Sequence, residues 1–284
     1  MSDLREELIN NIWNRKADYY KKANHSSKNL DKFDTYYKLK KYSQLENPYK
    51  ILDVGCGEGS VISYISHNKN LENYYGIDVS ELALNIAKHK HPKINFLTVY
   101  TEKIPFDDNK FNLTYTTYTL EHLLYPLITI NEMIRVTKNN GYCIFLCPNF
   151  GSPIYPSPCY KRNKIIRIIN GVFIDISRLL SPYKTLDWKS VIPIIDDNDK
   201  HITDHDTTVE PYLLSFVKYI KQNTKHEIIE YSSQWKTINK FYGVPTTTII
   251  KSLPFKLLGY YMHLYPFSYW GPTLFVVIKI KKEQ

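Results

Sequence analysis

The fold is decided by one stretch of the sequence, Ile51-Leu-Asp-Val-Gly-Cys-Gly-Glu-Gly-Ser60. Its opening residues are mostly apolar and follow Pro48, which predicts a short buried strand over residues 50–54. Three glycines then make a turn, and apolar side chains recur at helical spacing from Ser60 to residue 68. A strand, a glycine-rich turn and a helix in this order form a ligand-binding unit of parallel α/β sheets. The stretch therefore predicts both a fold class and the place of a ligand.

Two carboxylates accompany the glycines of this turn, at Asp53 and Glu58. In dinucleotide enzymes a G-x-G-x-x-G turn places a pyrophosphate at the N-terminus of the helix. The spacing here is G-x-G-x-G, and carboxylates beside a pyrophosphate would be repulsive. Beside the sulfonium and α-ammonium groups of S-adenosylmethionine (SAM) they are attractive. The charge of the turn therefore favours SAM over a dinucleotide.

Asp78 is a second candidate cofactor residue. It lies in a predicted strand over residues 74–79, near the spacing at which dinucleotide folds place an acid on the ribose hydroxyls. Such an acid suits the adenosine half of NAD and of SAM equally. Taken singly, the glycines could be only a tight turn, and Asp78 with Ser80 only a helix cap. Because they fall in register with the predicted strands, we interpret them together as a cofactor site.

Strands and helices alternate along the first half of the chain. Alternation of this kind implies parallel pairing and right-handed crossovers. After residue 148 the alternation is interrupted, and a helix near 212–222 leads into the last two strands. The predicted strands are residues 50–54, 74–79, 94–100, 111–116, 142–147, 226–231 and 273–280.

The chain divides into a predicted helical cap over residues 1–45 and a larger domain over residues 46–284. Two insertions interrupt the last third of that domain, at about 149–210 and 235–271. The first contains a short apolar helix around 165–180. Segments of this length between core elements are usually lids or binding loops.

Five stretches resemble the successive motifs of class I SAM-dependent methyltransferases, and the closest variety is the type-11 group, which includes the ubiquinone/menaquinone methyltransferases. The similarity covers roughly residues 45–150. It implies a Rossmann-like doubly wound α/β sheet of about seven strands, mostly parallel with an antiparallel last strand, flanked by helices. The stretches are Ile51–Ser60, Gly76–Ser80, Ile104–Asn112, Leu120–Leu123 and Arg135–Gly141.

The resemblance also implies a cofactor, S-adenosyl-L-methionine, with S-adenosyl-L-homocysteine as product. Carried over position by position, it places the glycine-rich turn at the methionine end and Asp78 on the ribose. Two positions depart from the family: Tyr100 stands where an acid often reads the adenine amino group, and Asn112 where an aspartate is usual. The implied cofactor-binding residues are Asp53, Gly55, Cys56, Gly57, Asp78, Val79, Thr101, Glu102 and Thr117.

His122 is the predicted catalytic residue, a general base just beyond the fourth strand, although a Glu-His pair there could equally serve packing. His201, His205 and Asp206 are predicted to face the substrate. The i, i+4 spacing of His201 and His205 could in principle bind a metal, but that pattern alone is weak, and Thr203 with Asp204 could simply cap a helix. We therefore predict no metal.

The composition of the chain limits the kinds of binding partner and cellular compartment that are expected. The net charge is +9, but the basic residues are scattered, so a solvated basic surface is favoured over nucleic acid. The four cysteines form no CxxC pair, which fits a reducing cytoplasm. The N-terminus does not resemble a signal peptide, and no apolar run reaches the length of a spanning helix. The aromatic segment 253–270 could line the acceptor site, contact a membrane peripherally, or simply pack on the sheet.

The sequence thus predicts a cytoplasmic SAM-dependent methyltransferase for a small-molecule, glycan or lipid-like acceptor. Two alternatives stay open. One is an RNA methyltransferase, which the charge of +9 allows but no Asn-Pro-Pro-Tyr-like motif or appended RNA module supports. The other is a SAM-binding partner subunit without catalysis, suggested by the departures at Tyr100 and Asn112. The sequence predicts neither the atom methylated nor the oligomeric state.

Overall fold

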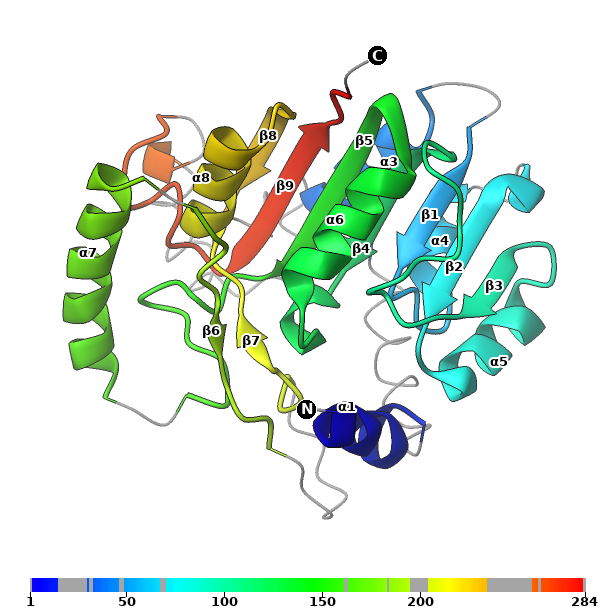
Figure 1. The fold of residues 1–284 in the computed structure, drawn as a ribbon, viewed down its shortest axis with the longest axis horizontal. Helices are drawn as coiled ribbons and strands as arrows, with labels where there is room; N and C mark the ends of the chain where they lie inside the picture. Colours follow the sequence, from blue (N-terminus) through cyan, green and yellow to red (C-terminus); the bar gives the residue numbers. More distant parts are fainter. Residues whose placement is uncertain are drawn as a thin grey trace.

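The computed structural model describes residues 2–14, 30, 33–45, 49–66, 70–160, 163–182, 184–194, 204–233, 257–259 and 262–282. Its centre is a seven-stranded sheet with the strand order β3-β2-β1-β4-β5-β9-β8 (Figure 1). All neighbouring pairs are parallel except the two that involve β9, which confirms the predicted fold class. The strands are β1 Ile51–Val54, β2 Tyr74–Asp78, β3 Asn95–Thr98, β4 Phe111–Thr117, β5 Thr137–Pro148, β8 Glu227–Ser232 and β9 Thr273–Lys279.

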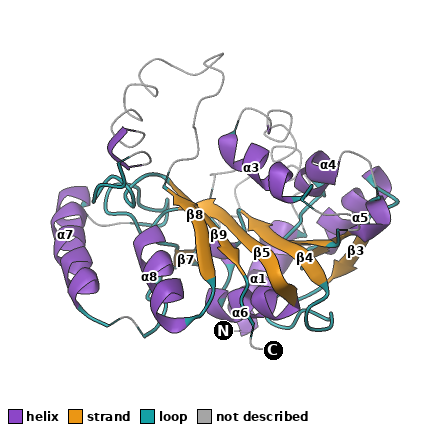
Figure 2. Cartoon of the chain, turned by 90° about the horizontal axis from the view of Figure 1, so that it is seen from above, coloured by secondary structure: helices purple, strands orange, loops and turns teal. Residues whose placement is uncertain are grey.

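Helices cover both faces of the sheet, as Figure 2 shows from above. One face packs on α6 (Pro126–Val136) and α8 (Leu213–Asn223). The other packs on α3 (Asp34–Tyr42), α4 (Ser60–Ser66) and α5 (Glu81–Lys90). The sheet is therefore doubly wound, with a hydrophobic core on each side.

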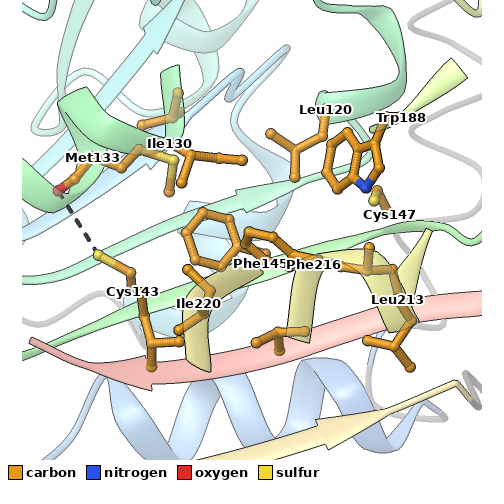
Figure 3. Close-up of a cluster of buried hydrophobic side chains, with 14 of the residues drawn as sticks. Leu120, Ile130, Met133, Cys143, Phe145, Cys147, Trp188, Leu213, Phe216 and Ile220 are labelled. Atoms are coloured by element: carbon orange, nitrogen blue, oxygen red, sulfur yellow. Dashed lines mark hydrogen bonds between the residues drawn. The ribbon is translucent and has the colours of Figure 1, made fainter. Parts of the chain in front are cut away.

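Strand β5 contributes apolar side chains to both hydrophobic cores, because successive side chains of a strand point to opposite faces of the sheet. Phe145 faces α8, where its ring lies edge-on to Phe216 with the centroids 5.0 Å apart (Figure 3). Ile144 and Leu146 face the opposite core. The strand begins five residues earlier than predicted, at Thr137, which pairs with Phe111 across a register shift.

The first insertion forms α7 (Lys164–Leu180) and a small antiparallel pair, β6 (Lys189–Ser190) with β7 (Val209–Glu210). Trp188 joins the main core beside Phe216, with ring centroids 5.7 Å apart. The insertion is thus anchored on the α8 side of the sheet, and α7 stands at the outer end of the molecule (Figure 1).

The N-terminal segment begins with α1 (Ser2–Leu8) and a π-helical turn, η1 (Ile9–Trp13). The Ser80 hydroxyl, at the end of β2, donates to the backbone oxygen of Trp13 at 2.8 Å. This contact places the segment over the carboxyl ends of the parallel strands. The division into a cap and a domain at residue 45 stays a prediction.

Among the described helices, none combines the length and the apolar character that a bilayer span requires.

Candidate cofactor and acceptor site

The glycine-rich turn after β1 has a backbone that only glycine adopts readily. Gly55, Gly57 and Gly59 have φ values of 78°, 52° and 82°. A Cβ atom on Gly55 would lie 2.2 Å from the Thr119 hydroxyl oxygen. The Gly55 amide donates to the backbone oxygen of Ile77 at 2.8 Å, which fixes the turn against the end of β2.

Asp78 ends β2 beside this turn. Its Oδ2 accepts from the Gly57 amide and its Oδ1 from the Ser80 amide, both at 2.8 Å. Burial raises the pKa of Asp78, although these backbone donors act in the opposite direction. Each oxygen keeps a further lone pair, and the residue is only half-buried, so it can still accept two ribose hydroxyls. Ser80 caps α5 by accepting from the Ala83 amide, so the capping interpretation also holds.

Asp53 is buried beneath the turn. Its Oδ2 accepts from the Tyr115 hydroxyl at 2.8 Å, while Oδ1 has no hydrogen-bond partner among the described residues. Burial raises the pKa of Asp53 to about 8. A buried acceptor without a donor is costly, so this oxygen fits a ligand that brings a donor or a positive charge. The glycine cradle, Asp78 and Asp53 together fit SAM.

Glu58 does not face this site as the charge argument assumed. Its carboxylate pairs with Lys90 of α5 at 2.5 Å and also accepts from the Ser60 hydroxyl. Lys90 lies in the last turn of α5 and reaches back to the turn, so the charge of Glu58 is neutralised within the protein. Of the two acids in the turn, only Asp53 is left for a cationic ligand.

A second polar cluster lies just beyond β4, around His122. The Nδ1 atom of His122 lies 3.3 Å from the backbone oxygen of Asp206 and 3.5 Å from its Oδ1. Its Nε2 atom lies 3.7 Å from Oε1 of Glu121. The indole N–H of Trp13 donates to Asp206 Oδ2 at 2.8 Å. The imidazole is therefore oriented by Asp206, and Asp206 is held in turn by the N-terminal segment.

The cluster is acidic and largely enclosed. Burial raises the pKa of Glu121 to about 8, and neither of its oxygens has a hydrogen-bond partner in the described part of the chain. Burial would lower the pKa of His122, but the Asp206 and Glu121 carboxylates raise it to about 9. His122 is thus protonated at neutral pH, and Glu121 becomes a carboxylate that can take a proton only as the pH rises toward about 8.

The same cluster could also hold a cation. Glu121, His122 and Asp204 offer ligand atoms that all lie within 4.8 Å of one another. This grouping differs from the spacing weighed in the sequence, because His201 lies outside the described residues and His205 is not a member. A metal ion, a substrate amine or the sulfonium of SAM would each match its negative charge.

The structure brings the glycine turn and Asp78 together, and the other predicted cofactor residues have the following surroundings. Cys56 is buried in the turn, Val79 is half-buried after β2, and Thr117 ends β4. The Thr101 hydroxyl is engaged with Thr129 of α6 at 2.9 Å, so its backbone is the part that could face adenine. Glu102 is half-buried beside it. These assignments stay predictions.

The sequence did not predict that Trp13, Glu121 and Asp204 lie together around His122 in the folded protein. Trp13 and Asp206 are 193 residues apart in the chain. The one usable signal was the Leu120-Glu-His-Leu123 motif, which marks the end of β4 but says nothing of partners from other segments.

Comparison with known proteins agrees with this geometry. Residues 52–145 match the family model described as a methyltransferase domain. A ubiquinone/menaquinone biosynthesis C-methyltransferase of Campylobacter jejuni is 28% identical over 107 residues, which are 36% of this chain and 46% of that protein. A phthiotriol/phenolphthiotriol dimycocerosates methyltransferase of Mycobacterium ulcerans is 24% identical over 121 residues, 41% of this chain and 44% of that protein. The chain spans about half the length of the curated relatives it matches.

Solved structures share the fold. A chain from the complex of the Haloferax volcanii Trm112 methyltransferase activator aligns with a TM-score of 0.54 at 14% identity, over 96% of this chain and 99% of that one. A SAM-dependent methyltransferase from Mesorhizobium loti aligns with a TM-score of 0.50 at 15% identity, over 88% and 99%. These likenesses support the fold, whereas the family match identifies residues 52–145 as a methyltransferase domain of the type-11 group, a class whose cofactor is SAM.

Proposed function

We propose that this protein transfers a methyl group from SAM to a small-molecule acceptor, with lipid-like molecules and glycans as the acceptor classes. One observation carries the proposal: the positive-φ glycine turn, the half-buried Asp78 and the unpartnered Oδ1 of Asp53 converge at the carboxyl ends of β1 and β2. Ligands bind at this edge in open α/β sheets.

The residues of this end would bind and orient the cofactor. The glycine turn lets the backbone approach the methionine portion, Asp78 accepts from the ribose hydroxyls, and Asp53 offers its free oxygen to a donor of the ligand. Val79, Cys56, Glu102, Thr117 and the backbone of Thr101 would complete the pocket. When bound, SAM supplies an activated methyl group, so the protein has chiefly to align the acceptor and exclude water.

The His122 cluster would serve the acceptor. We assign Asp206 and Trp13 to positioning, since Asp206 faces His122 and the indole rather than open space. His122 and Glu121 would act as the acid–base pair: the imidazolium holds the acceptor oxygen, and Glu121, once it is ionised as the pH rises toward about 8, takes the acceptor's proton. His205 is buried next to Asp206 in the sequence, and it is kept with His201 as a substrate-facing prediction.

The proposed acceptor class draws on the two curated relatives. One acts in ubiquinone and menaquinone biosynthesis and the other on phthiotriol dimycocerosates. Quinones of this kind and dimycocerosates are lipid-like, which favours an acceptor with a large apolar part.

Isothermal titration with S-adenosyl-L-homocysteine tests the proposal. The unmodified chain is expected to bind it, and Asp78→Asn is expected to weaken binding on the order of tenfold to a hundredfold, because a charge-assisted bond to the ribose is lost. Asp107→Asn, an exposed acid between β3 and β4, is the matched control and should bind normally. Binding of NAD without binding of S-adenosyl-L-homocysteine would overturn the assignment.

A further inference from the structure

Helix α7 turns most of its large apolar side chains away from the protein, although Ile168 and Val172 pack partly against the core. In a soluble protein the apolar stripe of such a helix faces the core and the charged residues face water. In α7 the buried side chain is Asp175. Phe173 and Leu180 are 68% and 81% exposed, so large apolar side chains point into the surroundings of the protein.

Directional polar contacts hold this orientation. Asp175 accepts from the Trp270 indole at 2.9 Å, from the Tyr212 hydroxyl, and from Arg178 at 3.0 Å. Arg167 pairs with Glu210 of β7 at 3.0 Å, and both side chains are largely buried. Turning the helix to bury its apolar face would leave Glu210 buried without its arginine, and the Tyr212 hydroxyl and Trp270 indole without their acceptor, which is strongly unfavourable. The exposed apolar face is therefore a fixed feature of the fold.

The outward face combines apolar side chains with basic charge. Its apolar residues recur every three or four positions, so they form one continuous stripe along the helix. Lys164 opens the helix and is exposed, and in the sequence Lys161 and Arg162 precede it. Asp175, turned inward, is the one acid within α7. We call the exposed apolar residues of this face the outward stripe; they are Ile165, Ile169, Phe173, Ile176 and Leu180.

A neighbouring segment adds further exposed apolar side chains. Tyr265 contacts the inward side of α7 through a hydroxyl donated to Asp175 at 3.4 Å, and its ring lies edge-on to Trp270. Met262 and Leu264 beside it are also exposed. An exposed apolar surface of this kind marks an interaction site in a soluble protein. It includes part of the segment 253–270 in which the sequence suggested a membrane contact; residues 253–256 and 260–261 lie outside the described part.

We propose that the outward stripe and residues 262–265 dock the protein on an anionic lipid surface, with α7 lying in the interface plane. An apolar face that begins at an exposed lysine, on a chain with a net charge of +9, has the composition that binds at the boundary between headgroups and acyl chains. Charge decides between a bilayer and a second copy of this chain. Two copies, each with a net charge of +9, repel one another, whereas anionic headgroups attract that charge.

The docking surface is joined to the acceptor site by β7. Arg167 of α7 pairs with Glu210, and the Thr208 amide, two residues earlier, donates to the Glu121 backbone oxygen at 2.8 Å. A lipid surface at α7 would therefore lie beside the element that frames the acceptor cluster. The idea that docking brings a lipid acceptor to the site rests on the proposed function. The docking inference itself does not rest on it.

Vesicle flotation of the full chain tests the inference. The protein is expected to float with vesicles of equal parts phosphatidylcholine and phosphatidylglycerol, to bind phosphatidylcholine alone more weakly, and to lose binding as salt rises. The double variant Ile169→Gln/Phe173→Gln should bind the anionic vesicles on the order of tenfold or more weakly, because two apolar side chains no longer insert. Ile128→Gln, an exposed isoleucine of α6, is the matched control and should bind as the unmodified chain does.

The variants keep their fold if they bind S-adenosyl-L-homocysteine with unchanged affinity. Undiminished vesicle binding by the double variant overturns the inference. So does failure of the unmodified chain to float, combined with a dimer that the double variant abolishes, because the stripe is then an interface between copies. Normal vesicle binding without any binding of S-adenosyl-L-homocysteine refutes the proposed function and leaves the docking inference intact.

Discussion

The cofactor turn and the α7 insertion are held in place by different kinds of contact. In the turn, backbone amides bond to groups close in the chain, such as Gly57 to Asp78, 21 residues away. In the insertion, side chains bond across long separations, such as Asp175 to Trp270, 95 residues away. The first arrangement follows from local backbone geometry, whereas the second depends on the completed fold.

The largest loss of stability is expected from removing the buried carboxylate of α7. Asp175→Ala leaves the Tyr212 hydroxyl and the Trp270 indole without their acceptor and removes a partner of Arg178. We expect the free energy of unfolding, measured in urea, to fall by about 3–5 kcal/mol.

Asp187→Ala is the matched control, because Asp187 binds the same arginine at 2.8 Å but its side chain is 38% exposed. An exposed ion pair contributes less than about 1 kcal/mol. Equal losses in the two variants would show that long-range polar contacts do not hold α7.

A smaller effect is expected at the cofactor turn. Gly55→Ala forces a Cβ onto a backbone with φ of 78° and into the Thr119 side chain. We expect a loss of about 2–3 kcal/mol in urea unfolding together with weaker binding of S-adenosyl-L-homocysteine.

Adding Thr119→Gly to this variant separates the two causes. It removes the atoms that a Cβ at residue 55 would meet, but it leaves the backbone conformation unchanged. Partial recovery is expected. Full recovery would mean that the turn does not need glycine for its backbone.

The last prediction is a change of slope, and it concerns pH and the acidic cluster around His122. The pKa of Glu121 rises from 4.5 to about 8 on folding, so the folded protein keeps a proton that the unfolded chain has lost. This contribution to stability is complete below pH 4.5 and is lost as pH rises toward about 8. Glu121→Gln should make the fall in unfolding free energy over this range shallower, by at most about 1.4 kcal/mol per pH unit.

Urea unfolding at several pH values within that range measures the slope. Asp53, with its pKa raised to about 8, and His122, with its pKa raised to about 9, give slopes of the same sign, so part of the fall remains in the variant. Glu132→Gln is the control: Arg135 lowers the pKa of Glu132, so its titration lies below the range and the slope should not change. An unchanged slope in Glu121→Gln would contradict the raised pKa.

Much of the fold could be predicted because its signals are local. The run at residues 50–54 is β1 Ile51–Val54, and the helical spacing around 165–180 is α7 Lys164–Leu180. The partners of Glu58 were not predictable in this way. Its charge argued for a cationic ligand, yet Lys90 neutralises it, because the far end of α5 lies against the turn only after α5 has packed on the sheet.

The sequence by itself determined the positions of the parallel strands, the glycine turn and Asp78, because periodicity and backbone sterics act over a few residues. Only the tertiary structure decided that Trp13, Glu121 and Asp206 surround His122, and that the apolar stripe of α7 faces outward. A helical repeat shows that one face is apolar but not which way that face points. The direction depends on which side of the helix makes contacts with the rest of the protein. In α7 the polar side chains Asp175 and Arg167 make those contacts.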